Sequence, residues 1–207
     1  MQQEILQRMF RNNIMLSAPR KKLSVIEEGD VLYAVKKAYE AMMPRTFRKR
    51  DQQSAHIPVE GKNKLFEWLS KEFSCLFRKG TDDFDGWHER VCDSFLGKLN
   101  QLLNENGYYE CAYGKAQKIV NVTFKLLFLY DDADKYTGIF EKCHFILSKE
   151  SLTWARENNI EVNQAWSNLT KEEYKQTQRQ IKEFLLNNGE GIPFYKEFNV
   201  WSEYRNR

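Results

Sequence analysis

Basic side chains gather near residue 50 of this 207-residue chain. Three are consecutive and a fourth lies just before them: Arg45, Arg48, Lys49 and Arg50. Guanidinium and ammonium groups at this density bind phosphate or carboxylate groups, because each supplies donors and positive charge. The alternative is a solvated basic loop without a ligand. The cluster therefore predicts a surface for nucleic acid or for an acidic protein.

A second polar set interrupts the apolar segment 114–130. Lys118, Asn121 and Lys125 follow one another at steps of three and four, with Gln117 beside them. This spacing places them on one face of a helix whose other positions are mostly apolar. Such a stripe must reach solvent, meet partners inside the protein or line a groove. We expect either an exposed helix edge or a groove in which Lys118 and Lys125 face an anion.

One spacing in the basic region has catalytic potential. Arg50 and His56 end the run Arg-Asp-Gln-Gln-Ser-Ala-His. This run is similar to the Arg, polar residue, His motif of HEPN ribonucleases, and the resemblance implies metal-independent RNA cleavage by a helical dimer. Histidine moves protons near neutral pH, and arginine stabilises a charged phosphorane. The sequence departs from the family because Pro58 disfavours helix at Ile57, whereas the family's motif lies within a continuing helix.

The striped segment carries a motif of its own. It reads Gly114-x-Ala116-Gln117-Lys118-x-x-Asn121-x-Thr123-x-Lys125-x-Leu127. This pattern resembles a motif of uncharacterised helical bacterial proteins of similar length. The resemblance extends to His144 and to the region of Trp166 and Glu173-Tyr174, over roughly residues 110–185. It implies no activity, only that the polar stripe is not accidental.

Other catalytic and metal-binding patterns are absent. Gly114-Lys115 lacks the earlier glycine and the following Ser or Thr of a phosphate-binding loop. No Gly-x-Gly-x-x-Gly or Gly-x-Ser-x-Gly occurs, and the four cysteines form no Cys-x-x-Cys pair. One loose set within two helical turns departs from the usual zinc spacings: Asp85, His88, Glu89 and Cys92. We expect reduced thiols, no metal and no cofactor.

The net charge of +3 conceals an uneven distribution. Residues 1–50 carry a net charge of +6, and the remaining 157 residues carry −3. The longest apolar run, 119–130, contains polar residues and is too short to span a bilayer. The first residues, Met-Gln-Gln-Glu, lack the basic and apolar regions of a secretory signal. We expect a cytoplasmic protein with no membrane partner.

The elements that position these residues are predicted to be helices. Apolar residues at steps of three and four, together with capping boxes at Ser24 and Thr170, predict helices over 31–42, 65–76, 84–103, 114–130, 148–158 and 174–186. An aromatic stretch follows at 194–204, and a short amphipathic piece is expected near Ile5 and Met9. Gly138 predicts a loop. Tyr108, Tyr109 and Tyr113 are predicted to be accessible aromatic residues.

We therefore expect one bundle-like all-α domain over residues 1–207, with about seven to nine helices around the apolar helix 114–130. Residues 1–58 are its candidate basic subregion. The predicted function is non-catalytic binding of nucleic acid or an acidic protein surface, through Arg45, Arg48, Lys49, Arg50, Lys118, Asn121 and Lys125. Two alternatives stay open: the ribonuclease with Arg50 and His56 as its catalytic pair, and a regulatory or inhibitory module whose aromatic carboxy-terminal segment docks on a partner.

Overall fold

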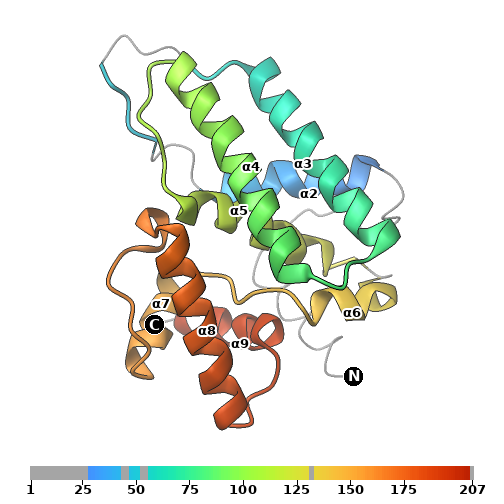
Figure 1. The fold of residues 1–207 in the computed structure, drawn as a ribbon, viewed down its shortest axis with the longest axis vertical. Coiled ribbons are helices and arrows are strands. Elements are labelled where there is room, and N and C mark those ends of the chain that lie inside the picture. The colour runs from blue at the N-terminus through green and yellow to red at the C-terminus, as the bar shows by residue number, and fades with distance from the viewer. Residues whose placement is uncertain (1–27, 43–46, 52–55, 131–132, 206–207) are drawn as a thin grey trace.

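The structure, a computed structural model, describes residues 28–42, 47–51, 56–130 and 133–205. These residues form a succession of helices (Figure 1). The α-helices are α2 (Glu28–Ala41), α3 (Val59–Lys79), α4 (Phe84–Glu105), α5 (Tyr113–Leu127), α6 (Thr137–Phe140), α7 (Lys149–Glu157), α8 (Lys171–Asn187) and α9 (Pro193–Arg205). Two 3-10 helices lie at Ala133–Tyr136 and Trp166–Asn168. The all-α prediction is confirmed.

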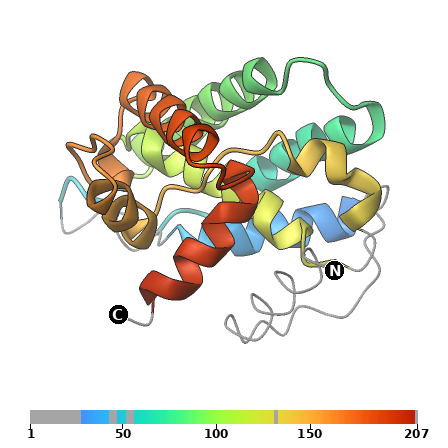
Figure 2. The ribbon, with the colours of Figure 1, turned by 90° about the horizontal axis from the view of Figure 1, so that it is seen from below.

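The two longest helices, α3 and α4, lie side by side at one end of the molecule (Figure 1). A connection of only four residues joins them, so they run in opposite directions. The amide of Gly80 donates to the Leu76 carbonyl at 2.8 Å and ends α3. Gly80 has φ +66°, a left-handed conformation that favours glycine. At the other end of the molecule, α9 crosses the lower face (Figure 2).

Side-chain caps begin three of the helices, including the capping box that the sequence predicts at Thr170. The Asp83 side chain accepts a hydrogen bond from the Gly86 amide at 2.8 Å and starts α4. Ser148 with Ser151 caps α7, and Thr170 with Glu173 caps α8, each as a capping box. These caps satisfy amide groups that have no partner inside the helix.

The structure contradicts one predicted loop and does not describe the first residues of the chain. The expected loop at Gly138 is wrong, because this residue lies in the short helix α6. A four-residue helix has too few positions to show a period of 3.6 residues, so the turn signal dominated the prediction. The amphipathic piece near Ile5 and the Ser24 capping box fall outside the described residues.

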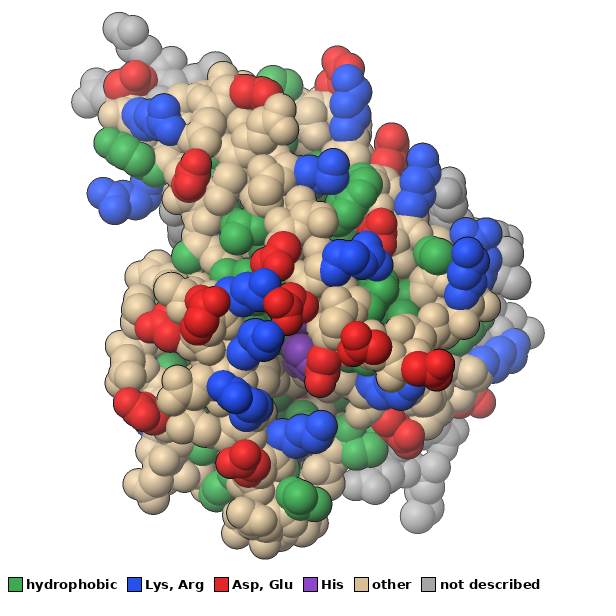
Figure 3. Space-filling model, in the orientation of Figure 1, with side chains coloured by type: hydrophobic (Ala, Val, Ile, Leu, Met, Phe, Trp, Pro, Cys, Tyr) green, Lys and Arg blue, Asp and Glu red, His purple; other side chains and the backbone are tan. Residues whose placement is uncertain are grey.

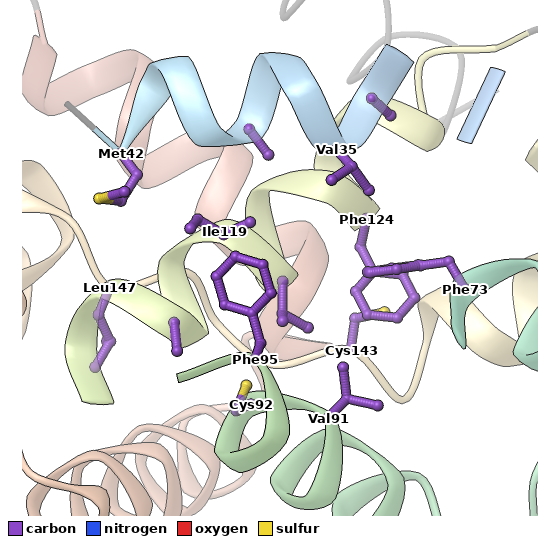
Figure 4. Close-up of a cluster of buried hydrophobic side chains, with 14 of the residues drawn as sticks. Val35, Met42, Phe73, Val91, Cys92, Phe95, Ile119, Phe124, Cys143 and Leu147 are labelled. Atoms are coloured by element: carbon purple, nitrogen blue, oxygen red, sulfur yellow. The ribbon is translucent and has the colours of Figure 1, made fainter. Parts of the chain in front are cut away.

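Helix α5 is the centre of the fold, as predicted. It packs against α2, α4, α8 and the 3-10 helix Trp166–Asn168. Figure 4 shows Ile119 and Phe124 of α5 between apolar side chains of α2 above and α4 below. Because apolar residues occur on most sides of α5, most of the helix is removed from water. The polar stripe of α5 is therefore carried into the interior.

In the part of the chain that the structure describes, no helix is both long and apolar enough to cross a membrane.

Candidate functional site

The basic segment at residues 48–50 is held in an extended conformation by one isolated β-bridge and its flanking hydrogen bonds. The Arg50 amide donates to the Gly107 carbonyl at 2.8 Å, and the Tyr109 amide donates to the Arg48 carbonyl at 2.9 Å. Lys49 and Tyr108 face each other as an isolated antiparallel bridge. These bonds attach the basic segment to the connection between α4 and α5.

Side chains alternate in direction along an extended segment, and here the alternation separates the three cations. The guanidinium carbons of Arg48 and Arg50 each lie 5.7 Å from the centroid of the Tyr109 ring. The Lys49 ammonium instead lies 5.9 Å from the centroid of Tyr108. Tyr109 is 51% exposed, whereas Tyr108 is buried. We call Arg48, Lys49, Arg50, Tyr108 and Tyr109 the basic–aromatic surface.

A cavity of about 480 Å³ opens beside this surface. Its wall combines aromatic rings with basic groups: Tyr39, Phe47, Lys49, His56, Ile57, Lys62 and Tyr108. Burial raises the pKa of Tyr39 to about 12, so this phenol carries no negative charge near neutral pH. None of these wall residues is acidic. The cavity therefore suits a ligand that has both an anionic group and a flat apolar part.

The structure brings together three of the four residues of the predicted basic cluster. Arg48, Lys49 and Arg50 are all exposed, and Arg45 lies outside the described residues. Of the three tyrosines predicted to be accessible, only Tyr109 is exposed. Tyr108 and Tyr113 are buried because their rings close the core beneath the α4–α5 connection.

Arg50 and His56 do not have the helical setting that the HEPN resemblance implies. Arg50 lies in the extended segment and donates from Nη2 to Oδ1 of Asn104. His56 precedes α3 and lines the cavity. The continuing helix of that family is missing because α3 begins only at Val59, directly after Pro58.

The polar stripe of α5 meets partners inside the protein. Lys125 Nζ lies 2.5 Å from Oε2 of Glu197, and the two side chains are 4% and 1% exposed. The rings of Phe198 and Trp201 flank the ammonium, with centroids at 4.7 and 4.9 Å. Burial lowers the pKa of Lys125, and the Glu197 carboxylate opposes that shift. The alternative of an exposed helix edge is wrong for Lys125.

Lys118 lies about two turns closer to the start of α5 than Lys125 and is half-buried. Its ammonium lies 3.4 Å from the Leu147 carbonyl oxygen and 5.4 Å from the centroid of Trp166. Burial lowers the pKa of Lys118 to about 8. The Lys118 amine thus lies close to an aromatic ring and a backbone carbonyl group.

Asn121 is the middle of a buried hydrogen-bond network. Its side-chain amide donates to Oε1 of Gln117 at 3.0 Å and to the Tyr174 hydroxyl at 2.9 Å. Its carbonyl oxygen lies 2.9 Å from Nε2 of His88. Gln117 in turn donates to the Gly114 carbonyl at 2.8 Å. These partners bind both the amide and the carbonyl group of Asn121. The residue is buried, so the alternative of an exposed helix edge is wrong for Asn121 as well.

The network continues to the surface through a second histidine. Nδ1 of His144 lies 2.7 Å from the Tyr174 hydroxyl, and Nε2 lies 2.8 Å from Oδ1 of Asp85. The bond to His144 lowers the pKa of Asp85. The rings of His88 and His144 are 4.2 Å apart. Burial, followed by the nearby His144, lowers the pKa of His88 well below its usual range.

Surface charges around this network are mixed in sign. The face in Figure 3 carries interspersed acidic and basic side chains with a histidine among them near the centre. Glu89, for example, pairs with Lys171 and Lys175 at 2.6 and 2.8 Å. Among the described residues, no group of three or more His, Cys, Asp or Glu side chains is placed to hold a metal ion. Asp85, His88 and Glu89 of the loose set instead contact His144, Asn121 and Lys171, respectively.

The motif residues around α5 meet in space. Gly114 leaves no room for a side chain, because a Cβ atom there would lie 1.8 Å from the Trp166 carbonyl oxygen. Gln117, Asn121, His144 and Tyr174 share one hydrogen-bond chain. The sequence missed two members of the polar interior, His88 and Glu197. A lysine on an apolar helix indicates a buried acid, but its position in the chain cannot be read from spacing.

The aromatic carboxy-terminal segment is part of the core. Helix α9 buries Phe194, Phe198 and Val200, and Figure 2 shows it crossing the lower face of the molecule. Phe128 of the segment after α5 contacts both phenylalanine rings. These side chains are therefore occupied within the protein.

Comparison with known proteins adds no function to this geometry. No family model, no curated protein and no solved structure matches the chain. The chemistry of the site therefore follows from two features of the molecule. One is an exposed set of cations and rings beside a cavity, and the other is a closed network of buried polar groups.

Proposed function

We propose that this protein binds single-stranded nucleic acid through the basic–aromatic surface. The observation that carries the proposal is the strand-like pairing of residues 48–50 with residues 107–109. This pairing spreads three consecutive cations over two tyrosine rings, where a disordered basic loop would leave them unaligned. Proteins that bind single strands combine backbone-tracking cations with aromatic rings that stack on bases.

Arg48 and Arg50 supply the part of the surface best suited to a phosphate backbone. A guanidinium group presents several donors in one plane and stacks on flat rings. Both groups lie against the exposed Tyr109 ring, so a phosphate and a base can be contacted at the same place. An acidic peptide would match the charge but would leave the ring without a stacking partner. The aromatic component therefore favours nucleic acid over an acidic protein.

Fluorescence anisotropy with labelled single-stranded RNA and DNA tests the proposal. Three phosphate contacts predict a fall in affinity of about 20-fold between 50 and 200 mM salt, because bound counterions are released on association. An affinity that stays flat over this range would overturn the proposal. A polyglutamate peptide serves as the competing acidic ligand, and tighter binding of that peptide than of either nucleic acid would also overturn it.

Variants locate the surface. Replacing Arg48, Lys49 and Arg50 together with alanine should abolish the salt-dependent binding. The matched control replaces three exposed cations elsewhere on the protein: Lys71, Lys79 and Arg179. The control removes the same charge but should retain most of the affinity. Equal loss in both triple variants would show that binding follows net charge rather than this surface.

Variants of Tyr109 distinguish base stacking from charge attraction. Tyr109→Ala should weaken binding of a single strand by about 10-fold or more, since one base–ring stack contributes about 1–3 kcal/mol. Tyr109→Phe keeps the ring and should retain the affinity. The salt dependence should be unchanged in both variants because no cation is removed.

A further inference from the structure

We propose that the cavity beside the basic–aromatic surface binds the terminal nucleotide of the strand and recognises its terminal phosphate. This inference rests on the proposed function and assigns a ligand to the adjoining cavity. The wall residues, their charges and the burial of three of them in the core support it.

The cavity and the surface are continuous through two shared residues. Lys49 and Tyr108 line the cavity and also form the bridge that holds the basic segment. Lys49 points away from Arg48 and Arg50 because side chains alternate along the extended segment. A nucleic-acid strand bound to the two arginines therefore reaches the cavity by crossing from one side of residues 48–50 to the other.

Three of the residues that line the cavity belong to the packed core. Tyr39, Phe47 and Tyr108 are all buried, and the Tyr39 ring packs on Phe66 of α3 at 5.0 Å. A polynucleotide therefore cannot run through the cavity. A volume of about 480 Å³ lies within the range of small-ligand sites. It suits one nucleotide at the end of a strand, with its base against the rings.

Positive charge surrounds the cavity and selects a terminal phosphate. Lys49, His56 and Lys62 line the wall. A further lysine, Lys115, has its ammonium 5.2 Å from the centroid of the Phe47 ring. A phosphate monoester carries a charge of about −1.5 to −2 near pH 7, whereas each internal phosphodiester carries −1. The cavity should therefore prefer a phosphorylated end to a hydroxyl end and to an internal phosphate.

Competition binding with one oligonucleotide sequence in four forms tests the inference: a 5′-phosphate strand, a 3′-phosphate strand, a strand with two hydroxyl ends and a covalently closed circle. We expect one phosphorylated form to bind about 10-fold more tightly than the hydroxyl-ended strand. The circle should bind no more tightly than the hydroxyl-ended strand. The form that gains affinity identifies the end. Equal affinities of all four forms would overturn the inference while leaving the proposed function intact.

Lys62 provides the decisive variant. Lys62→Ala should remove the preference for a phosphorylated end and leave the affinity of the hydroxyl-ended strand within about twofold. The control is Lys64→Ala, because Lys64 is on the same helix but pairs with Glu60 at 2.8 Å on the exposed surface. An unchanged end preference in Lys62→Ala, with the fold confirmed by circular dichroism, would overturn the inference. If the unmodified protein binds none of the four oligonucleotides, the proposed function itself is overturned.

Discussion

The imidazole of His144 accepts a hydrogen bond from the Tyr174 hydroxyl, across 2.7 Å between Nδ1 and the phenolic oxygen. The direction of this bond follows from the neighbours of both groups. Tyr174 already accepts from the Asn121 amide, so its own proton points to His144. Nε2 of His144 in turn lies 2.8 Å from Oδ1 of Asp85. A hydrogen-bond chain thus joins an exposed carboxylate to the centre of the protein.

Tyr174→Phe should destabilise the fold because it leaves the buried Asn121 amide and the half-buried His144 without this partner. The Asn121 amide loses an acceptor and His144 loses a donor, which together should cost about 2–4 kcal/mol. Urea denaturation measures the change. Tyr195→Phe is the matched control, because no described residue pairs with the buried Tyr195 hydroxyl. The control should change stability by less than about 0.5 kcal/mol, and equal losses would contradict the network.

His88 should make the stability depend on pH. Its pKa is lowered in the folded protein, so the unfolded chain binds a proton more readily below about pH 6.5. The stabilisation is therefore complete above that pH and declines as the pH falls, by about 1.4 kcal/mol for each unit below about pH 6. Asp85, His144 and Cys92 are the titratable groups close to it.

Denaturation between pH 7 and pH 5 checks this dependence. His88→Gln keeps a side-chain donor for Asn121 but cannot take up a proton, and it should flatten the profile. His56→Gln, at an exposed position, should leave the slope unchanged. If His88→Gln and the unmodified protein have the same slope, another group causes the dependence.

Replacing only one residue of the Lys125–Glu197 pair should lower the free energy of unfolding more than replacing both. Glu197→Leu leaves the buried ammonium without this carboxylate and should cost about 3–5 kcal/mol. Combining it with Lys125→Met removes both charges and should recover most of that loss. Glu60→Leu, in the exposed pair with Lys64, should cost less than about 1 kcal/mol. Additive effects of the two buried substitutions in urea denaturation would contradict a direct interaction.

Binding of RNA should occur without cleavage. His56 lines the cavity but lacks the helical setting expected of a HEPN pair, so a labelled RNA incubated with the protein should stay intact on a denaturing gel. Chelator-resistant cleavage that disappears in both His56→Ala and Arg50→Ala would support the ribonuclease alternative instead.

The sequence was most informative where neighbouring residues determine the structure. Thr170 and Glu173 predict the start of α8 because both members of a capping box lie in one turn. The apolar surroundings of Ile119 and Phe124 predict a buried central helix for the same local reason. Gly138 was misread because a single turn of helix leaves no periodic pattern.

The partners of the polar stripe could not be predicted because they are distant in sequence. Glu197 is 72 positions from Lys125, and Tyr174 is 53 positions from Asn121. Spacing shows that such side chains need partners, but only tertiary packing selects them. Likewise, residues 48–50 were identified as basic, whereas their division between two sides depends on pairing with residues 107–109.

That division has a consequence for how the segment can change over generations. Exchanging one cation for another at Arg48, Lys49 or Arg50 keeps each charge on its own side. Inserting a single residue between Phe47 and Arg48 would reverse the sides, because a shift of one position turns every side chain of an extended segment over. The arginines would then face the cavity and the lysine would face Tyr109. The length of this segment is therefore under tighter constraint than its composition.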